Sequence, residues 1–143
     1  MMRLTNRLHR GTIRATGGRL GWRLYGMPVV ELTTIGRRSG QPRTSMLTCP
    51  LHDGDTFVIV ASRGGDPVHP AWFLNLRDRD VNPEIFVKVQ NGAFWSVPDI
   101  LDEGPEHDRI WELLCEDRAW YRDYQTRCNR TIPLVRLPET RPA

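Results

Sequence analysis

Two short turn sequences, Asp53-Gly54 and Asn91-Gly92, constrain the fold of this chain more than any other feature. Each stands between runs of strand-forming residues, and each contains residues that accept the positive φ values of a two-residue hairpin turn. Strands that are joined by such turns pair as antiparallel neighbours. The middle of the chain therefore predicts a mostly antiparallel sheet.

The expected strands are short and numerous, because runs of β-branched and aromatic residues alternate with turn signals. They span residues 28–33, 43–52, 56–62, 84–91, 93–100 and 132–137. A short helix is expected over residues 70–76, and a longer one over 105 to about 127. The longer helix is predicted to turn inward Ile110, Leu113, Leu114 and Trp120 or Tyr121. This pattern favours an α+β fold built on a small, closed or partly closed barrel.

With 143 residues, 39% of them hydrophobic, the chain suits a single small domain with a real core. We predict three segments along it. Residues 1–27 form a basic, partly helical N-terminal arm, residues 28–138 form the barrel domain, and residues 139–143 form a frayed C-terminal tail.

Positive charge is concentrated at the beginning of the chain. Residues 1–30 contain six arginines and no acid, so the total net charge of +3 leaves −3 on the rest. An arm of this kind seeks an anionic surface, which makes it a candidate for peripheral contact with acidic lipid. The acidic body argues against a nucleic-acid partner.

The three cysteines, Cys49, Cys115 and Cys128, form an odd set without metal-ligand spacing. The sequence also lacks an apolar signal segment and any run long enough to span a membrane. We therefore expect reduced thiols and a cytoplasmic protein. The basic arm suggests that the protein could contact the inner face of the membrane.

One turn has the composition of an anion-binding loop. Residues 32–44 combine guanidiniums, glycines that let backbone amides approach a ligand, and hydroxyl donors, namely Arg37, Arg38, Arg43, Gly36, Gly40, Ser39 and Thr44. Guanidinium groups bind carboxylate or phosphate oxygens two at a time. The predicted ligand is therefore anionic.

A second small-residue turn, residues 61–65, follows the strand that ends near Val60, and His69 to Phe73 place an imidazole and an indole at the start of the short helix. No hydrolase motif, metal-ligand cluster, Walker loop or dinucleotide fingerprint occurs. An anion-binding rim without an evident nucleophile or metal suits an enzyme whose reactive group is a cofactor.

Six motifs occur in the order of a known family. They are Thr-Thr-x-Gly-Arg-Arg-Ser-Gly-x-Pro-Arg, Val-Ala-Ser-x-Gly-Gly, His-Pro-Ala-Trp-Phe-x-Asn-Leu, Asn82-Pro83, Asp123-Tyr124-Gln125 and Arg130-Thr131-Ile132-Pro133. Over roughly residues 28–138 the chain thus resembles the deazaflavin-dependent nitroreductases of actinobacteria. The resemblance implies a split β-barrel that uses coenzyme F420, a 5-deazaflavin with a phosphate and an oligoglutamate tail.

The implied activity is hydride transfer from reduced F420 to a quinone or another electron-poor conjugated or nitro acceptor. Two alternatives stay open: a split-barrel oxidoreductase that binds FMN, and a non-catalytic F420-binding protein. The oligomeric state is also open, with a dimer as one alternative. Arg118 stands where some members of the family have an aromatic residue, so the acceptor itself is not implied.

The resemblance also implies roles for individual residues. The phosphate and glutamate tail would be held by Arg37, Arg38, Ser39 and Arg43. The cofactor would run alongside Thr44, Ser45, Met46, Leu47 and Thr48. The deazaflavin would be flanked by Val60, Ala61, Ser62, Arg63, Ala71, Trp72, Phe73, Leu74 and Asn75, and closed over by Tyr121. Catalytic roles fall to Ser62 as a donor to the acceptor oxygen, and to Tyr121 and Tyr124, which would shape the acceptor pocket or donate a proton.

Overall fold

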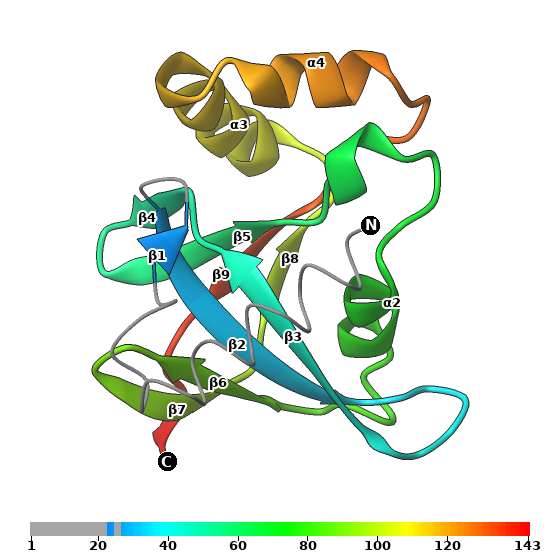
Figure 1. Ribbon diagram of the computed structural model, residues 1–143, viewed down its shortest axis with the longest axis vertical. Helices are drawn as coiled ribbons and strands as arrows, with labels where there is room; N and C mark the ends of the chain where they lie inside the picture. The colour runs from blue at the N-terminus through cyan, green and yellow to red at the C-terminus, as the bar shows by residue number, and fades with distance from the viewer. Residues whose placement is uncertain (1–22, 25–26) are drawn as a thin grey trace.

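A computed structural model describes residues 23–24 and 27–143, which form two antiparallel sheets and flanking helices (Figure 1). The first sheet comprises β1 (Arg23–Leu24), β2 (Met27–Ile35), β3 (Pro42–Thr48), β6 (Ile85–Val89), β7 (Gly92–Ser96) and β10 (Arg141–Pro142). Its order is β1-β2-β6-β7-β10. The strand β3 also pairs with β2, on the edge opposite β6. The second sheet has the order β4-β5-β9-β8, from β4 (Leu51–Asp53), β5 (Thr56–Val60), β9 (Leu134–Leu137) and β8 (Asp99–Leu101).

The two sheets are connected where the chain passes from β3 to β4 and from β7 to β8. Cys49-Pro50 separates the first pair of strands, and Val97-Pro98 separates the second. Proline has no N–H for a ladder and interrupts pairing, so each of the expected strands 43–52 and 93–100 is in fact two strands. The chain continues from one antiparallel sheet into the other at both points, and the predicted α+β split barrel is confirmed.

Both predicted hairpins form, but their turns differ. In the β4–β5 hairpin Asp53 pairs with Thr56, and Gly54 has a φ of 61°. In the β6–β7 hairpin Val89 pairs with Gly92, and neither residue of the Asn91-Gly92 dipeptide has a positive φ. The second hairpin was thus predicted correctly, whereas the backbone conformation expected at its turn was wrong.

The main core lies between the sheets. Along β2 the buried and half-buried side chains alternate for most of the strand, as expected when one face of a strand packs inward. Val30, Leu32, Ile59, Val87 and Val135 are almost completely buried in this cluster. The helix α2 (Ala71–Arg77) adds Trp72, Phe73 and Leu76 to the same core.

The expected helix over residues 105–127 is in fact two helices, α3 (Pro105–Asp117) and α4 (Trp120–Thr126). The chain leaves helical geometry at Arg118, with φ −137° and ψ 85°, although no glycine or proline occurs there. Arg118 instead pairs with Asp117, and its guanidinium lies over the Trp120 ring. These side-chain contacts accompany a break that helix propensity does not indicate.

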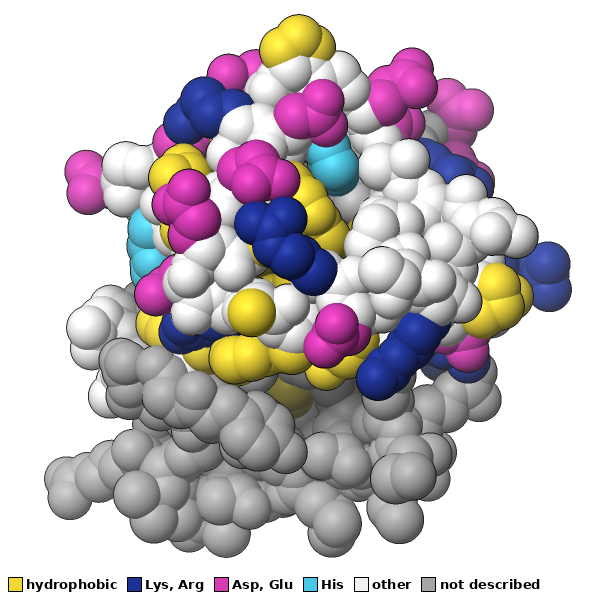
Figure 2. Space-filling view, turned by 90° about the horizontal axis from the view of Figure 1, so that it is seen from above, with side chains coloured by type: hydrophobic (Ala, Val, Ile, Leu, Met, Phe, Trp, Pro, Cys, Tyr) yellow, Lys and Arg dark blue, Asp and Glu magenta, His cyan; other side chains and the backbone are white. Residues whose placement is uncertain are grey.

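A second core packs α3 and α4 against the β4-β5-β9-β8 sheet. Ile110, Leu114 and Tyr121 are buried there as predicted, together with Trp111 and Cys115, which were not expected. Leu113 keeps 44% of its surface exposed, so the inward position predicted for it was wrong. Of the two alternatives Trp120 and Tyr121, it is Tyr121 that turns inward, and Trp120 keeps 42% of its surface exposed. Seen from above, acidic side chains gather on the face that α3 and α4 form (Figure 2).

The C-terminal tail is paired, contrary to the expected fraying of residues 139–143. Arg141 pairs with Trp95 and Pro142 with Phe94 across the edge of β7. The Arg141 guanidinium lies over the Trp95 ring, 4.6 Å from its centroid, and its Nε donates to Glu84 at 3.0 Å. These contacts come from residues distant in sequence, so the composition of the tail could not reveal them.

Almost all of the predicted N-terminal arm, residues 1–27, lies outside the described residues. None of the helices in the described part of the chain is long and apolar enough to cross a membrane.

Candidate active site

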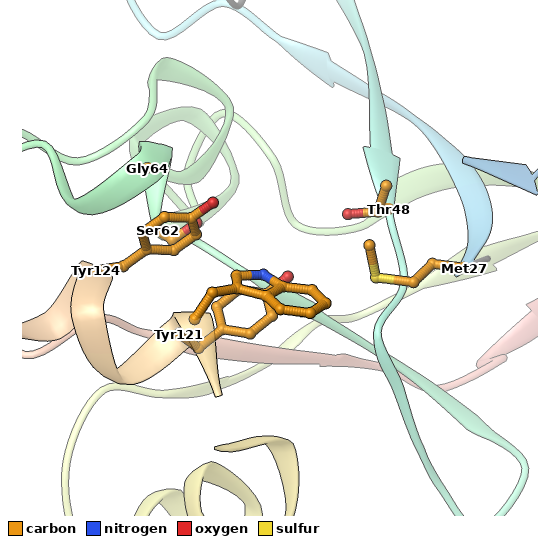
Figure 3. Close-up of a pocket in the computed structure, with 7 residues that line it drawn as sticks. Met27, Thr48, Ser62, Gly64, Tyr121 and Tyr124 are labelled. Carbon is orange, nitrogen blue, oxygen red and sulfur yellow. The ribbon is translucent and has the colours of Figure 1, made fainter. Parts of the chain in front are cut away.

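A cavity of about 560 Å³ opens between the end of β5, α4 and the adjacent ends of β2 and β3. It is lined by Met27, Thr48, Ser62, Gly64, Trp120, Tyr121 and Tyr124 (Figure 3). Four of these side chains carry a hydroxyl, and the Met27 thioether and the ring carbons of the Trp120 indole add apolar surface. A volume of this size is typical of small-molecule sites, which combine apolar walls with a few polar groups.

Ser62 reaches the cavity because the chain turns sharply after β5. The turn is a short 3-10 segment, η1 (Arg63–Gly65), in which Arg63, Gly64 and Gly65 have φ values of 46°, 65° and 84°. Arg63 is the one described non-glycine residue with a positive φ. Such conformations cost free energy and persist where the surroundings determine them, often at functional sites.

Gly65 brings this turn into close contact with α4. A Cβ atom at this position would lie 2.6 Å from the Tyr124 carbonyl oxygen and 3.0 Å from the Tyr124 Cα. The Ser62 turn and the helix that carries Tyr121 and Tyr124 are therefore in direct backbone contact. This contact defines one wall of the cavity.

Tyr121 is buried, with 5% of its surface exposed, and its ring packs edge-on against Tyr124 at 5.5 Å between centroids. Burial away from water and the neighbouring Tyr124 raise the pKa of Tyr121 to about 12, although a hydrogen bond with the Thr48 side chain acts in the opposite direction. The phenol therefore keeps its proton at neutral pH. Tyr121 can donate a hydrogen bond within the cavity.

Among the residues predicted for the site, the structure brings Thr48, Ser62, Tyr121 and Tyr124 together around one cavity. Sequence reasoning missed Met27, Gly64 and Trp120 as lining residues. Gly64 was part of a recognised motif, so its signal was present. Trp120 had no such signal, because its exposure depends on the break between α3 and α4.

The predicted anion-binding loop is the turn between β2 and β3, at the far end of these strands from the cavity (Figure 1). Its guanidinium side chains Arg37, Arg38 and Arg43 form no ion pair with any carboxylate in the described part of the chain. Arg43 donates to the Ser39 hydroxyl at 3.2 Å. The loop thus presents a positive charge that no described carboxylate neutralises.

Two buried asparagines fix this loop to α2. The Asn75 Oδ1 accepts from the Arg37 backbone N–H at 3.1 Å and from Arg37 Nη1 at 3.0 Å. The Asn82 side chain accepts from the Ile35 N–H at 2.7 Å and donates to the Ile35 and Asn75 carbonyls, both at 2.9 Å. Asn75 therefore positions Arg37, and Asn82 fixes Ile35 at the beginning of the loop. The Asn82-Pro83 motif was the available signal for this arrangement.

Several other predicted contact residues face the interior. Met46 and Ala61 are buried, and the side chains of Trp72 and Phe73 have 8% and 1% of their surface exposed in the main core. Within residues 71–75 it is Ala71 that is exposed and Leu74 that is half-buried. Ser45, Leu47 and Val60 are half-buried, and Arg63 is exposed. The described residues contain no group of three side chains that could hold a metal ion.

Comparison with known proteins shows which family the chain resembles. The chain matches the model of the F420H(2)-dependent quinone reductase family over residues 5–139. An F420H(2)-dependent quinone reductase of Mycobacterium tuberculosis strain H37Rv is 40% identical over 134 residues, which are 92% of this chain and 87% of the relative.

Two solved structures support the same fold. One, described as a domain-swapped dimer, has a TM-score of 0.65 and 32% identity, and covers 92% of this chain and 96% of its own. The other, an F420-H2 dependent reductase, has a TM-score of 0.62 and 34% identity, and covers 78% of this chain and 94% of its own.

Proposed function

Because the chain belongs to the F420H2-dependent quinone reductase family, we propose that it transfers a hydride from reduced coenzyme F420 to a quinone or a similar electron-poor acceptor. The single observation that carries the proposal is the cavity in which Thr48, Ser62, Tyr121 and Tyr124 place hydroxyls beside apolar walls. A flat conjugated ring suits apolar walls, and its oxygen atoms suit hydroxyl donors.

The β2–β3 turn fits the acidic tail of the cofactor. Arg37, Arg38 and Arg43 have no carboxylate partner among the described residues, so a phosphate or glutamate carboxylate does not have to displace an existing ion pair. The acidic face of α3 and α4 lies at the other end of the molecule (Figures 1 and 2). This charge distribution favours one orientation of an anionic ligand.

When bound, reduced F420 supplies the hydride, and the protein must position the acceptor and stabilise the charge that reaches its oxygen. We assign this to the Ser62 hydroxyl and the Tyr121 phenol. Because the pKa of Tyr121 is about 12, the phenol donates a hydrogen bond to an acceptor oxygen and does not give up its proton fully at neutral pH. Tyr124, edge-on to Tyr121, shapes the wall of the acceptor pocket.

The direct test follows oxidation of reduced F420 by the purified protein with menadione in the absence of oxygen. We expect saturable turnover, and a loss of about 100- to 1,000-fold in kcat for Ser62→Ala because a donor to the developing charge is removed. Thr126→Ala on α4 is the matched control, since its hydroxyl is exposed and donates to the Asp123 carbonyl. Cofactor oxidation that never exceeds the protein-free rate, across several quinones, would contradict the proposal.

The same protein tests the two alternatives. Equilibrium dialysis against F420 and FMN measures both affinities, and the proposal expects binding of F420. Preference for FMN would favour the flavin alternative. Tight F420 binding without turnover of any acceptor would favour a non-catalytic binding protein.

We also propose that the six arginines of residues 1–30 attract the protein to anionic lipid. Each basic residue near such a surface contributes about 1 kcal/mol. Co-sedimentation with vesicles that contain phosphatidylglycerol should exceed that with neutral vesicles, and should fall when Arg3, Arg7 and Arg10 are replaced by glutamine. Equal sedimentation with both lipids would contradict this idea.

Self-association is a further proposal, suggested by the similar structure that is described as a domain-swapped dimer. Sedimentation velocity over a range of protein concentrations should show a dimer. A monomer at every concentration would refute it.

A further inference from the structure

Arg130 makes an unusual set of contacts beside the cavity. It lies in the segment between α4 and β9 and is half-buried. Its guanidinium donates to three backbone carbonyls: Nε to Asp66 at 2.9 Å, Nη1 to Ala61 at 3.0 Å and Nη2 to Ser62 at 2.8 Å. Nη1 also lies 3.2 Å from the His69 Nδ1. Four of its five N–H groups thus have protein partners.

All three carbonyls belong to the turn that delivers Ser62 to the cavity. The Ser62 carbonyl also accepts the Gly65 N–H at 2.9 Å, so this oxygen is held from two directions. The next residue, Arg63, has a strained positive φ of 46°. A strained turn keeps its shape when its surroundings over-determine it. Charge-assisted hydrogen bonds, which are about twice as strong as neutral ones, provide this restraint.

Arg130 is itself fixed to the helix of the two tyrosines. The Gln125 side chain in α4 donates to the Arg130 carbonyl at 2.7 Å and accepts from the Ile132 N–H at 3.0 Å. The Ala61 N–H donates to the Pro133 carbonyl at 2.9 Å on the other side of the turn. One continuous set of hydrogen bonds therefore runs from α4 through Arg130 to Ser62.

We propose that Arg130 is a positioning residue that holds the Ser62 turn in register with Tyr121 and Tyr124 on α4. It does not line the cavity, so it acts on the reaction through the placement of the Ser62 hydroxyl. This inference rests on the proposed function of the cavity. It extends that function by naming a group outside the cavity on which the rate depends.

The conservative substitution Arg130→Lys separates geometry from charge. Lysine keeps the positive charge but presents it at one point, so it cannot span three carbonyls that a planar guanidinium reaches at once. Arg122→Lys is the matched control, because Arg122 also lies in the C-terminal region and pairs only with the exposed Glu112 within the described residues. Gln125→Met is a second variant that loosens Arg130 without changing the guanidinium.

Two measurements are made on each variant. The first is the steady-state rate with reduced F420 and menadione well below the unfolding temperature. A misplacement of about 1 Å can cost up to about 100-fold in rate, so we expect kcat to fall by about 10- to 100-fold in Arg130→Lys while the affinity for oxidised F420 is retained. The second is hydrogen exchange of the peptide that contains residues 61–66, which should become faster in Arg130→Lys and in Gln125→Met.

The outcomes are distinguishable. Wild-type exchange and wild-type kcat in Arg130→Lys would overturn the proposal, as would a loss of kcat that the Arg122→Lys control shares. Faster exchange with a normal kcat would also overturn it, since the turn would then be loosened without effect on the reaction. If the wild-type protein lacks reductase activity altogether, the proposed function fails, and the exchange experiment still reports whether Arg130 holds the turn.

Discussion

The contact between the Ser62 turn and α4 can be tested with a single methyl group. In Gly65→Ala the new Cβ would lie 2.6 Å from the Tyr124 carbonyl oxygen and 3.2 Å from the Arg127 Cβ. The first distance is shorter than protein Cβ atoms tolerate, and the contacted atom is backbone, so α4 and the turn must move apart. Gly65 also has a φ of 84°, which an alanine adopts only with strain.

The magnitude has two parts. A left-handed backbone at a non-glycine residue costs about 1 to 2 kcal/mol. Forcing extra volume into a closely packed contact costs a further 1 to 3 kcal/mol or so. We therefore expect Gly65→Ala to lower the free energy of unfolding by about 2 to 5 kcal/mol. At roughly 3 °C per kcal/mol for a domain of this size, Tm should fall by about 6 to 15 °C.

Gly54→Ala is the matched control. Gly54 has a similar φ of 61° in the β4–β5 turn, but no atom lies within 4 Å of the position that its Cβ would take. It should therefore lose only the backbone contribution, about 1 to 2 kcal/mol, and keep full activity because it does not line the cavity. Thermal unfolding followed by circular dichroism measures both variants, and menadione reduction measures activity below the lower Tm. Equal destabilisation of the two variants, with equal activity, would refute the reasoning.

Three further predictions concern charge and protonation. Arg38→Ala and Arg43→Ala should each weaken F420 binding by about 1 to 3 kcal/mol, because a charge-assisted contact to the tail is lost, and unchanged affinity in equilibrium dialysis would remove them from the site. Burial is the main cause, and the charges of Arg130 and Arg77 are smaller causes, of a His69 pKa below its usual 6.5. As pH falls, His69 is therefore protonated in the unfolded state at a higher pH than in the folded state. The free energy of unfolding should then fall as pH decreases from about 6.5 toward this lowered pKa, and His69→Gln should flatten that part of a urea-unfolding profile measured against pH. Burial also raises the pKa of the Cys49 thiol to about 11, so Cys49 should react with a thiol reagent near pH 8 only after unfolding, and fast labelling of the native protein, located by mass spectrometry, would contradict this.

Much of the fold was predictable because its signals are local. The Asp53-Gly54 and Asn91-Gly92 turns predicted antiparallel neighbours, and the paired registers of β4–β5 and β6–β7 confirm them. Pro50 and Pro98 could have predicted that two of the expected strands are interrupted. The break at Arg118 could not be predicted in this way, since no glycine or proline occurs there.

The site residues also include some that the sequence indicated and some that only the structure could place. Ser62, Tyr121 and Tyr124 were predicted as site residues from the resemblance to the family, and all three line the cavity. Trp72 and Phe73 lie in a motif as well, yet their side chains are buried in the main core. A motif reports that residues occur together in a family, and it does not distinguish a side chain that faces a ligand from one that supports the wall behind it.

By itself, the sequence determined the antiparallel strands, the arginine-rich turn and the resemblance to a family, because turn geometry and charge are properties of short segments. The tertiary structure decided that α4 separates from α3, that the tail pairs with β7, and that Arg130 joins Ser62 to the tyrosine helix. The last two features rest on contacts between residues far apart in the chain. Their energies exist only once the two sheets have brought those residues together.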